Sequence, residues 1–157
     1  MIVVIGEILI DMFTEYERIG GAPFNFAFHM QKLGFPVRFF SRVGNDGYGR
    51  EIIAMLGKNG FNTADVQIDS QHPTGMVHVV LDDHGVPSFD ICEDSAYDHL
   101  DIDVAMDVAD PEMIYFGTLL QRTDTGCRRV QRLLARHSDN ATRFCDINMR
   151  PPHVNAR

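Results

Sequence analysis

Short apolar runs mark the strands of this chain. The first run covers residues 2–5, reads IVVI and ends at Gly6. A run without alternating polar residues is typical of a strand that is buried on both faces of a sheet. Further apolar stretches predict strands at residues 37–43, 66–68, 113–116 and 141–147.

Apolar residues at helical spacing lie between several of these runs. Pro23 can open a helix without losing a needed hydrogen bond, and apolar side chains then recur at three- and four-residue intervals until Gly34. Two further helices are predicted at residues 48–59, closed by Gly60, and at 124–137. The strand–helix alternation predicts an α/β fold, with a doubly wound, mostly parallel sheet and right-handed crossovers.

One segment breaks this alternation. Residues 74–81 and 86–91 are two extended runs joined by the turn sequence Asp-Asp-His-Gly, which predicts a β-hairpin. A hairpin inserted into an otherwise regular α/β order commonly covers a binding site. We therefore expect residues 74–91 to act as a lid.

Composition narrows the class of protein. The 157 residues, 45% hydrophobic and 23% charged, suit one soluble domain with a core. The formal net charge of −8 argues against binding to nucleic acid or to a membrane surface, but it leaves room for a phosphorylated ligand. No apolar run reaches ~18 residues, and the amino-terminal residues lack the basic start of a signal peptide, so we expect neither a transmembrane helix nor secretion.

Cysteine and histidine usage adds two expectations. The three cysteines are odd in number, far apart and form no CxxC motif, which indicates reduced thiols in a cytoplasmic protein. The seven histidines show no metal-site spacing, so the sequence predicts no metal site.

The stretch GGAPFNFA, residues 20–27, combines a glycine pair with a helix start. Gly20 and Gly21 alone indicate a turn, and Asn25 alone can be a turn former or can bind a polyol, because an amide both donates and accepts. Asp11, just beyond the first strand, is on its own either a solvated loop acid or a hydroxyl acceptor. The glycine pair follows a predicted polar loop and lacks a third glycine, so it is not the GxGxxG fingerprint of a dinucleotide-binding dehydrogenase.

Taken together, these stretches resemble the PfkB-type carbohydrate kinases, which have the ribokinase-like fold. GGAPFNFA, Gly34 and VGNDGYG are similar to the first signature of that family, and GEILID, TGMVHVVLDDHG, FGTLLQR and DINMRPP extend the likeness over all 157 residues. GEILID is similar to the opening of its fructokinase-like members. The resemblance implies ATP-dependent phosphorylation of a sugar hydroxyl, with Mg²⁺ as the metal of the complete enzyme.

The resemblance also implies a sugar site at the start of the chain. Asp11 and Asn25 would bind sugar hydroxyls, and Gly20 and Gly21 would let the backbone approach the sugar. No catalytic residue and no metal ligand is implied within this chain.

The hairpin and the end of the chain would complete the implied site. Residues 74–91 would close over the sugar, with Phe89 and Ile91 either touching it or only packing in the sheet, and a homodimer through the hairpin is expected. Arg150 would lie near the substrate or the transferred phosphoryl group, or it is a surface residue.

Two departures from the family pattern change the expectation. The stretch ICEDSA carries Cys92, Glu93 and Asp94 where fructokinase-like members often have Arg, which leaves fructose, adenosine and keto-acid sugars open as substrates. The second signature, a G-A-G-D-type segment with the general-base Asp and the γ-phosphate anion hole, is absent from these residues.

We therefore expect residues 1–157 to be the N-terminal, sugar-binding part of a kinase whose catalytic and nucleotide-binding half is missing. Such a chain would be inactive alone and would expose an apolar edge and face. The alternative is a non-catalytic sugar-binding or regulatory module that retains only the sugar half.

Overall fold

The computed structural model of the chain describes residues 1–81, 84, 86–137 and 141–148. Its larger sheet is parallel, with strand order β5 (Val66–Asp69), β4 (Val37–Gly44), β1 (Ile2–Ile5), β8 (Met113–Gly117) and β9 (Thr142–Asp146). The central β1 is buried along its whole length, because β4 and β8 pair with its two edges. The five strands predicted from the apolar runs are confirmed, with ends shifted by at most one residue.

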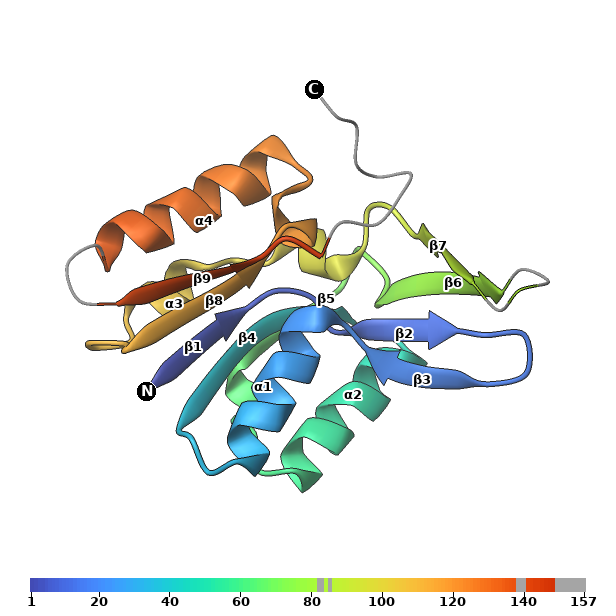
Figure 1. Cartoon of the computed structure of the whole chain (residues 1–157), viewed down its shortest axis with the longest axis horizontal. Helices are drawn as coiled ribbons and strands as arrows, with labels where there is room; N and C mark the ends of the chain where they lie inside the picture. Colours follow the sequence, from blue (N-terminus) through green and yellow to red (C-terminus); the bar gives the residue numbers. More distant parts are fainter. Residues whose placement is uncertain (82–83, 85, 138–140, 149–157) are drawn as a thin grey trace.

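Helices cover both faces of this sheet (Figure 1). On one face, α1 (Ala22–Lys32) and α2 (Gly47–Lys58) pack their apolar sides against Val4 of β1 and Phe39 of β4. On the other face, α3 (Asp103–Met106) and α4 (Asp124–Arg136) cover Val3 and Ile5. Successive residues of β1 thus point into two separate cores, which confirms the doubly wound α/β class.

A second, mixed sheet lies beside the larger one (Figure 1). Its strands run in the order β3 (Glu17–Gly20), β2 (Leu9–Met12), β6 (Gly75–Leu81) and β7 (Pro87–Ile91). β6 and β7 pair antiparallel, so the hairpin within residues 74–91 is confirmed, and β6 also pairs parallel with β2. The hairpin is therefore anchored on the strand that carries Asp11.

The prediction for the segment between β1 and α1 was wrong. Asp11 lies within β2 rather than in a loop beyond the first strand, and Gly20 ends β3 rather than following a polar loop. β3 reads ERIG, with one apolar side chain, so its own pattern does not predict a strand. Antiparallel pairing with β2, with Leu9 opposite Gly20, makes it one.

Three 3₁₀ turns complete the connections, at Thr63–Asp65, Ala96–His99 and Leu119–Gln121. The second of these follows the hairpin and the third follows β8, so both lie near the carboxyl ends of the parallel strands. Among the helices that the structure describes, none combines the length and apolar character that crossing a membrane requires.

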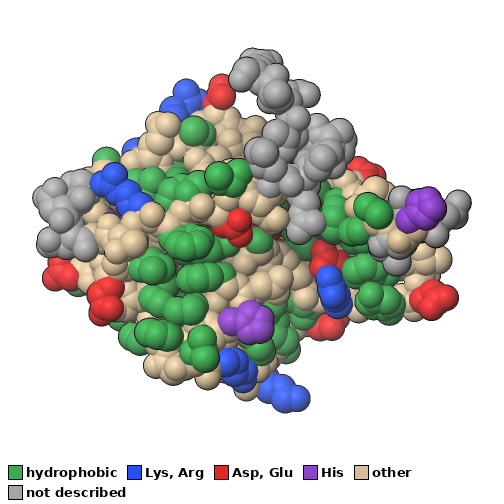
Figure 2. Space-filling model, viewed as in Figure 1, with side chains coloured by type: hydrophobic (Ala, Val, Ile, Leu, Met, Phe, Trp, Pro, Cys, Tyr) green, Lys and Arg blue, Asp and Glu red, His purple; other side chains and the backbone are tan. Residues whose placement is uncertain are grey.

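An apolar face is exposed next to β9, as expected. Phe144 on this edge strand is 46% exposed and Ile147 is 59% exposed. Phe144 stacks on Tyr115 with ring centroids 5.4 Å apart, and Tyr115 stacks on Phe26 at 4.2 Å. Figure 2 shows hydrophobic side chains gathered over the part of the molecule where β9 and α1 lie. We call Phe26 and Phe144, together with the buried Tyr115 on which both rings stack, the β9 face.

Candidate functional site

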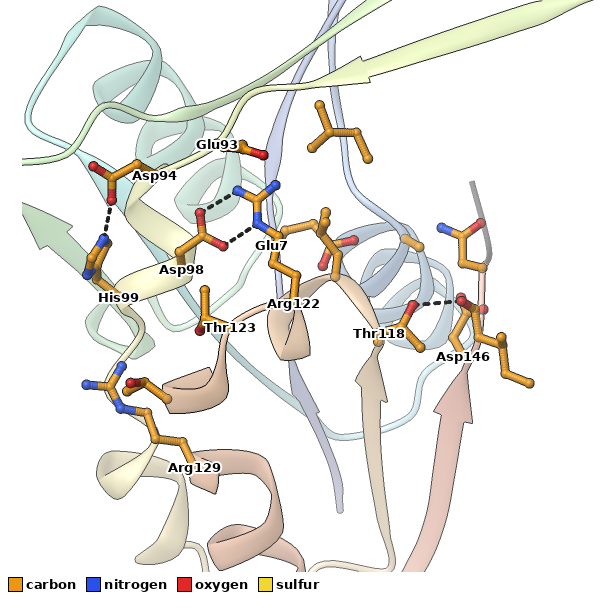
Figure 3. Close-up of a pocket in the computed structure, with 17 residues that line it drawn as sticks. Glu7, Glu93, Asp94, Asp98, His99, Thr118, Arg122, Thr123, Arg129 and Asp146 are labelled. Carbon is orange, nitrogen blue, oxygen red and sulfur yellow. Dashed lines mark hydrogen bonds and ion pairs between the residues drawn. The ribbon is translucent and has the colours of Figure 1, made fainter. Parts of the chain in front are cut away.

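A cavity of about 830 Å³ opens where the carboxyl ends of β1, β8 and β9 meet the end of the hairpin (Figure 3). Open α/β sheets bind their ligands at this edge. Its walls come from the β1–β2 turn with the start of α1, the segment after β7, the β8–α4 connection and the residues after β9. The lining residues are Glu7, Ala22, Ile91, Glu93, Asp94, Asp98, His99, Gly117, Thr118, Leu119, Arg122, Thr123, Thr125, Arg129, Asp146, Ile147 and Asn148.

The most unusual group in this cavity is the carboxyl of Glu7. The residue is 3% exposed, and its Oε2 has no hydrogen-bond partner among the described residues. Burial raises the pKa of Glu7 to about 7. The backbone N–H groups of Glu7 and Ala22 favour the charged form and lower the pKa, but burial outweighs them. Near neutral pH this carboxyl can therefore either donate a hydrogen bond to a ligand in the cavity or accept one from it.

A buried ion pair ties the hairpin to the cavity wall. Arg122 donates from Nε to Asp98 Oδ1 at 2.8 Å and from Nη2 to Asp98 Oδ2, and Nη2 also donates to the backbone oxygen of Cys92 at 2.9 Å. Asp98 is 6% exposed. Because Cys92 directly follows β7, this one guanidinium fixes the end of the hairpin to the β8–α4 connection. Its charge is already balanced by Asp98, so we assign it a positioning role.

The ends of β8 and β9 add hydroxyl and carboxylate groups. Tyr115 donates to Asp146 Oδ2 at 2.5 Å, and Thr118 donates to the backbone oxygen of Ile147 at 2.7 Å. Burial, followed by this hydrogen bond, raises the pKa of Tyr115 above its usual range, so its hydroxyl stays protonated. Tyr115 does not itself line the cavity and holds Asp146 from behind. The lining includes the carboxyl groups of Glu7 and Asp146 and the hydroxyls of Thr118, Thr123 and Thr125, and such groups can bind a polyol.

The structure brings Asp11 and Gly20 together. Asp11 sits on β2 with its side chain 16% exposed, and Oδ2 is 3.3 Å from Nε of Arg18. A Cβ added at Gly20 would lie 2.4 Å from the same Oδ2, so a larger residue there would require the carboxylate to move. The pairing of β2 with β3 thus presents Asp11 beside the glycine pair.

Gly21 and Asn25 lie at the start of α1. Gly21 has a φ of +111°, and a Cβ there would lie 2.6 Å from the backbone oxygen of Glu7, so glycine is required on both counts. Gly21, one of the predicted sugar-site residues, therefore lies against the backbone of Glu7, which lines the cavity. Asn25 is exposed in the first turn, and its backbone N–H donates to the Gly21 oxygen at 2.9 Å.

The hairpin residues divide between two places. Ile91 is 8% exposed and lines the cavity, whereas Phe89 packs against the small core formed by Leu9, Val77, Val79, Ile91 and Tyr97. Arg150 lies outside the described residues. Of the predicted site residues, Ile91 contributes directly to the cavity lining, and Gly20 and Gly21 lead into Ala22, which also lines it.

The starts of three helices are partly occupied by side chains of the same chain. A phosphate commonly binds at a helix N-terminus. Here the start of α2 is capped by Asp46, which accepts from the Gly49 N–H at 2.7 Å, and the start of α4 is capped by Thr123. The backbone N–H of Ala22 in α1 donates to the Glu7 carboxyl. In each of these helices one of the first N–H groups is therefore already paired.

Sequence reasoning did not identify Glu7, Asp98, Arg122 or Asp146 as cavity residues. A charged residue inside the apolar run MIVVIGEILI was a usable signal for Glu7, because burial of a carboxyl in such a run requires a reason. Asp98 and Arg122 are 24 residues apart, so the sequence pattern carries no sign of their pairing.

Comparison with known proteins gives a consistent picture. The family described as "pfkB family carbohydrate kinase" matches residues 1–155. The chain is 29% identical over 163 residues to a Pyrococcus horikoshii protein named as a sugar kinase, PH1459, covering 96% of this chain and 52% of that protein. It is 26% identical to fructokinase-2 of Oryza sativa, covering 97% of this chain and 50% of that one.

Solved structures of such proteins share this fold. The structure of PH1459 superposes with a TM-score of 0.84 at 26% identity, covering 98% of this chain and 57% of that one. A fructokinase of Xylella fastidiosa also gives 0.84, at 24% identity, and covers 99% and 52%. The chain spans about half the length of these relatives and corresponds to their N-terminal part. On the strength of the family match along nearly its whole length, this chain belongs to the pfkB family of carbohydrate kinases.

Proposed function

We propose that residues 1–157 are the sugar-binding part of an ATP-dependent sugar kinase, with the hairpin within residues 74–91 as its lid. The observation that carries this proposal is the position of Asp11, whose carboxylate lies over Gly20 on a strand that pairs directly with the hairpin. The family match supports it. Ile91 of the hairpin and Ala22 at the start of α1 line the neighbouring cavity, whereas Asp11 and Asn25 do not.

The sugar would bind between Asp11 and the start of α1. The Asp11 carboxylate would accept hydrogen bonds from sugar hydroxyls, and the side-chain amide of Asn25 would donate to one hydroxyl and accept from another. The glycine pair would let the sugar approach the backbone. Ile91, and Phe89 when the hairpin closes, would supply apolar contacts that exclude water.

Phosphoryl transfer would require groups from outside this chain. Transfer depends on a positioned general base, neutralisation of phosphate charge and a bound metal–nucleotide complex. A general base alone contributes roughly 10²–10⁴ in rate. One N–H at the start of each of α1, α2 and α4 is already paired with a side chain. We propose that ATP and Mg²⁺ bind a further part of the complete enzyme and that this chain alone does not turn over.

The relatives indicate which sugars to test. Structures have been determined of PH1459 with ATP and of a Vibrio cholerae fructokinase with fructose, ADP and calcium. A 5-dehydro-2-deoxygluconokinase of Geobacillus kaustophilus is 42% identical over 57 residues. Fructose and keto-acid sugars are therefore both candidates. Arg150 would lie near the substrate or the transferred phosphoryl group.

A second candidate function is a sugar-binding or regulatory module without catalysis. The helix starts that pair with side chains of the same chain favour it, because α1, α2 and α4 each have one N–H group that is not free for a phosphate. The two functions are separated by reading the gene beyond the codon of Arg157. An in-frame G-x-G-D segment within roughly 150 further residues, about one domain, supports the kinase, and an immediate stop codon supports the module.

An activity measurement tests the kinase directly. We expect the 157-residue chain to consume no ATP above background with fructose, ribose or 2-keto-3-deoxygluconate. We expect the chain extended by its downstream coding sequence to phosphorylate at least one of them. Turnover by the 157-residue chain itself would contradict the proposal that phosphoryl transfer needs a further part of the enzyme.

We further propose that the hairpin forms a homodimer contact. Val80 on β6 and Val86 before β7 are each 59% exposed, so the hairpin presents apolar side chains to solvent. Pairing with a second copy would remove them from water.

A further inference from the structure

Three potential metal ligands converge at the base of the hairpin, outside the proposed sugar site. His72 lies in the connection that enters β6, Asp94 lies in the connection that leaves β7, and His99 lies in the following 3₁₀ turn. Figure 3 shows Asp94 and His99 directed at one another at the rim of the cavity. The three residues therefore join segments that are far apart in sequence and that flank both strands of the hairpin.

The distances between the three groups suit a shared ion. His99 Nε2 lies 2.8 Å from Asp94 Oδ1, and His72 Nε2 lies 3.7 Å from the same oxygen. One ligand atom from each residue lies within 4.8 Å of the others. A tetrahedral ion with bonds of about 2 Å holds its ligand atoms about 3.3 Å apart, so the required shifts are small.

A buried carboxylate holds the His72 ring in the orientation that metal-bound histidines have. Asp69 is 1% exposed, and its Oδ2 lies 3.0 Å from Nδ1 of His72. The same carboxylate accepts from the backbone N–H groups of Gln71 and His72 and pairs with Arg42 at 2.7 Å. An Nδ1–H bonded to a carboxylate leaves Nε2 with its lone pair directed toward Asp94, which is the outer-shell arrangement of metal-bound histidines.

Asp94 provides a second sign of a built site. Its φ of +53° lies in the left-handed region, which non-glycine residues rarely adopt. Such backbone positions gather at ligand sites, because the surrounding structure must hold them there. Here the conformation places a 76% exposed side-chain carboxylate beside the Nε2 edges of both imidazoles.

We propose that His72, Asp94 and His99 form a site for a divalent transition metal of the Zn²⁺ class. Two imidazole nitrogens and one carboxylate oxygen are the mixed ligands that Zn²⁺ takes, whereas Mg²⁺ requires oxygen ligands. The imidazole rings stack at 3.6 Å with an angle of 13°, so coordination requires them to tilt apart, which the 40% exposed His99 can do by side-chain rotation. The fourth position is open to solvent.

A bound ion would hold the base of the hairpin. The two connections already meet through one backbone hydrogen bond, from Ala96 N–H to the Pro73 oxygen at 2.8 Å. A metal ion joining His72 to Asp94 would add a second and stronger link between them. Ion binding is therefore expected to stiffen the two connections at the base of the hairpin.

Titration of the whole 157-residue chain tests this proposal. We expect Zn²⁺ to bind with 1:1 stoichiometry and micromolar or tighter affinity by calorimetry, and Co²⁺ to give the intense visible absorption of a tetrahedral site. His99→Ala and Asp94→Asn should each weaken Zn²⁺ binding at least tenfold and abolish the Co²⁺ absorption. His29→Ala, at an exposed histidine of α1, is the matched control and should change neither.

The variants distinguish a specific Zn²⁺ site from nonspecific binding of Zn²⁺ to surface side chains. His72→Ala also removes a partner of buried Asp69 and can impair folding, so the test rests on His99 and Asp94, which are more exposed. Millimolar binding, binding that His99→Ala and Asp94→Asn leave unchanged, or equal losses in His29→Ala would each overturn the proposal.

Discussion

The carboxylate of Asp11 occupies the space that a side chain at residue 20 would fill. A Cβ on Gly20 would lie 2.4 Å from Asp11 Oδ2 and 2.9 Å from its Cγ. The glycine pair in GGAPFNFA is thus explained first by contacts within the chain, because Gly20 accommodates Asp11 and Gly21 accommodates the backbone of Glu7. If the glycine pair also lets a sugar approach the backbone, this role comes in addition to making room for Asp11 and Glu7.

Replacing Gly20 tests that relationship. In Gly20→Ala the new methyl group must displace the Asp11 carboxylate, which is the movable end of a side chain. We expect a loss of about 1–3 kcal/mol in unfolding free energy and a loss of sugar affinity of at least tenfold. Gly47→Ala is the matched control, because a Cβ there meets no atom within 4 Å. Unchanged sugar affinity in Gly20→Ala would separate Asp11 from the sugar site.

The buried carboxyl of Glu7 predicts a pH dependence of stability. Its pKa is raised from 4.5 to about 7 in the folded state, so the folded protein holds this proton more tightly than the unfolded chain. The stability that the protonated form contributes is fully present below about pH 4.5 and is lost as the pH rises through about 7. The shift corresponds to about 3 kcal/mol.

Substitution of Glu7 isolates this effect. Between pH 5 and 8 the unfolding free energy of wild type should fall as Glu7 loses its proton, and Glu7→Gln should lack this fall. The unfolding free energy of Glu7→Gln minus that of wild type should therefore increase with pH. Urea unfolding at several pH values measures it. Glu51→Gln, at an exposed residue of α2, should follow the wild-type profile. Parallel profiles for wild type and Glu7→Gln would show that Glu7 does not titrate in this range.

The Asp98–Arg122 pair predicts a non-additive mutant cycle. Arg122→Met leaves the carboxylate of Asp98 buried without its partner, and we expect a loss of about 3–5 kcal/mol in unfolding free energy. Adding Asp98→Asn to Arg122→Met should restore part of that loss, since no buried charge remains. Denaturant unfolding of the four proteins measures the coupling, and additive losses would refute it.

The β9 face predicts self-association. Phe144→Lys should lower concentration-dependent association in sedimentation velocity while costing less than about 1 kcal/mol in stability, because Phe144 is only partly buried. Val80→Lys makes the same change on the hairpin. Loss of association in Val80→Lys alone would place the contact on the hairpin, as proposed for the homodimer, and loss in Phe144→Lys alone would place it on the β9 face.

Much of the larger sheet was predictable because its signals are local. β1 is an unbroken apolar run, α1 has a proline in its first turn, and Gly34 and Gly60 follow the helix ends. These features act within a few residues, so the pattern alone specifies them. The hairpin was predictable for the same reason, since its turn chemistry and extended runs are adjacent.

The remaining features depend on contacts between distant residues. β3 is a strand only because β2 pairs with it, and the cavity pair Asp98–Arg122 forms only after the hairpin and the β8–α4 connection meet. His72, Asp94 and His99 likewise lack any metal-binding spacing in sequence, and the fold alone gathers them. The expected contacts of Asp11 and Asn25 with a sugar remain predictions.

Calorimetric titration of the chain with fructose, ribose and 2-keto-3-deoxygluconate determines whether Asp11 binds a sugar. We expect at least one of them to bind at millimolar or lower concentration, with affinity weakened at least tenfold by Asp11→Asn and unaffected by Glu51→Gln. Absence of heat from all three sugars, or equal affinity in wild type and Asp11→Asn, would contradict the proposed binding of a sugar by Asp11.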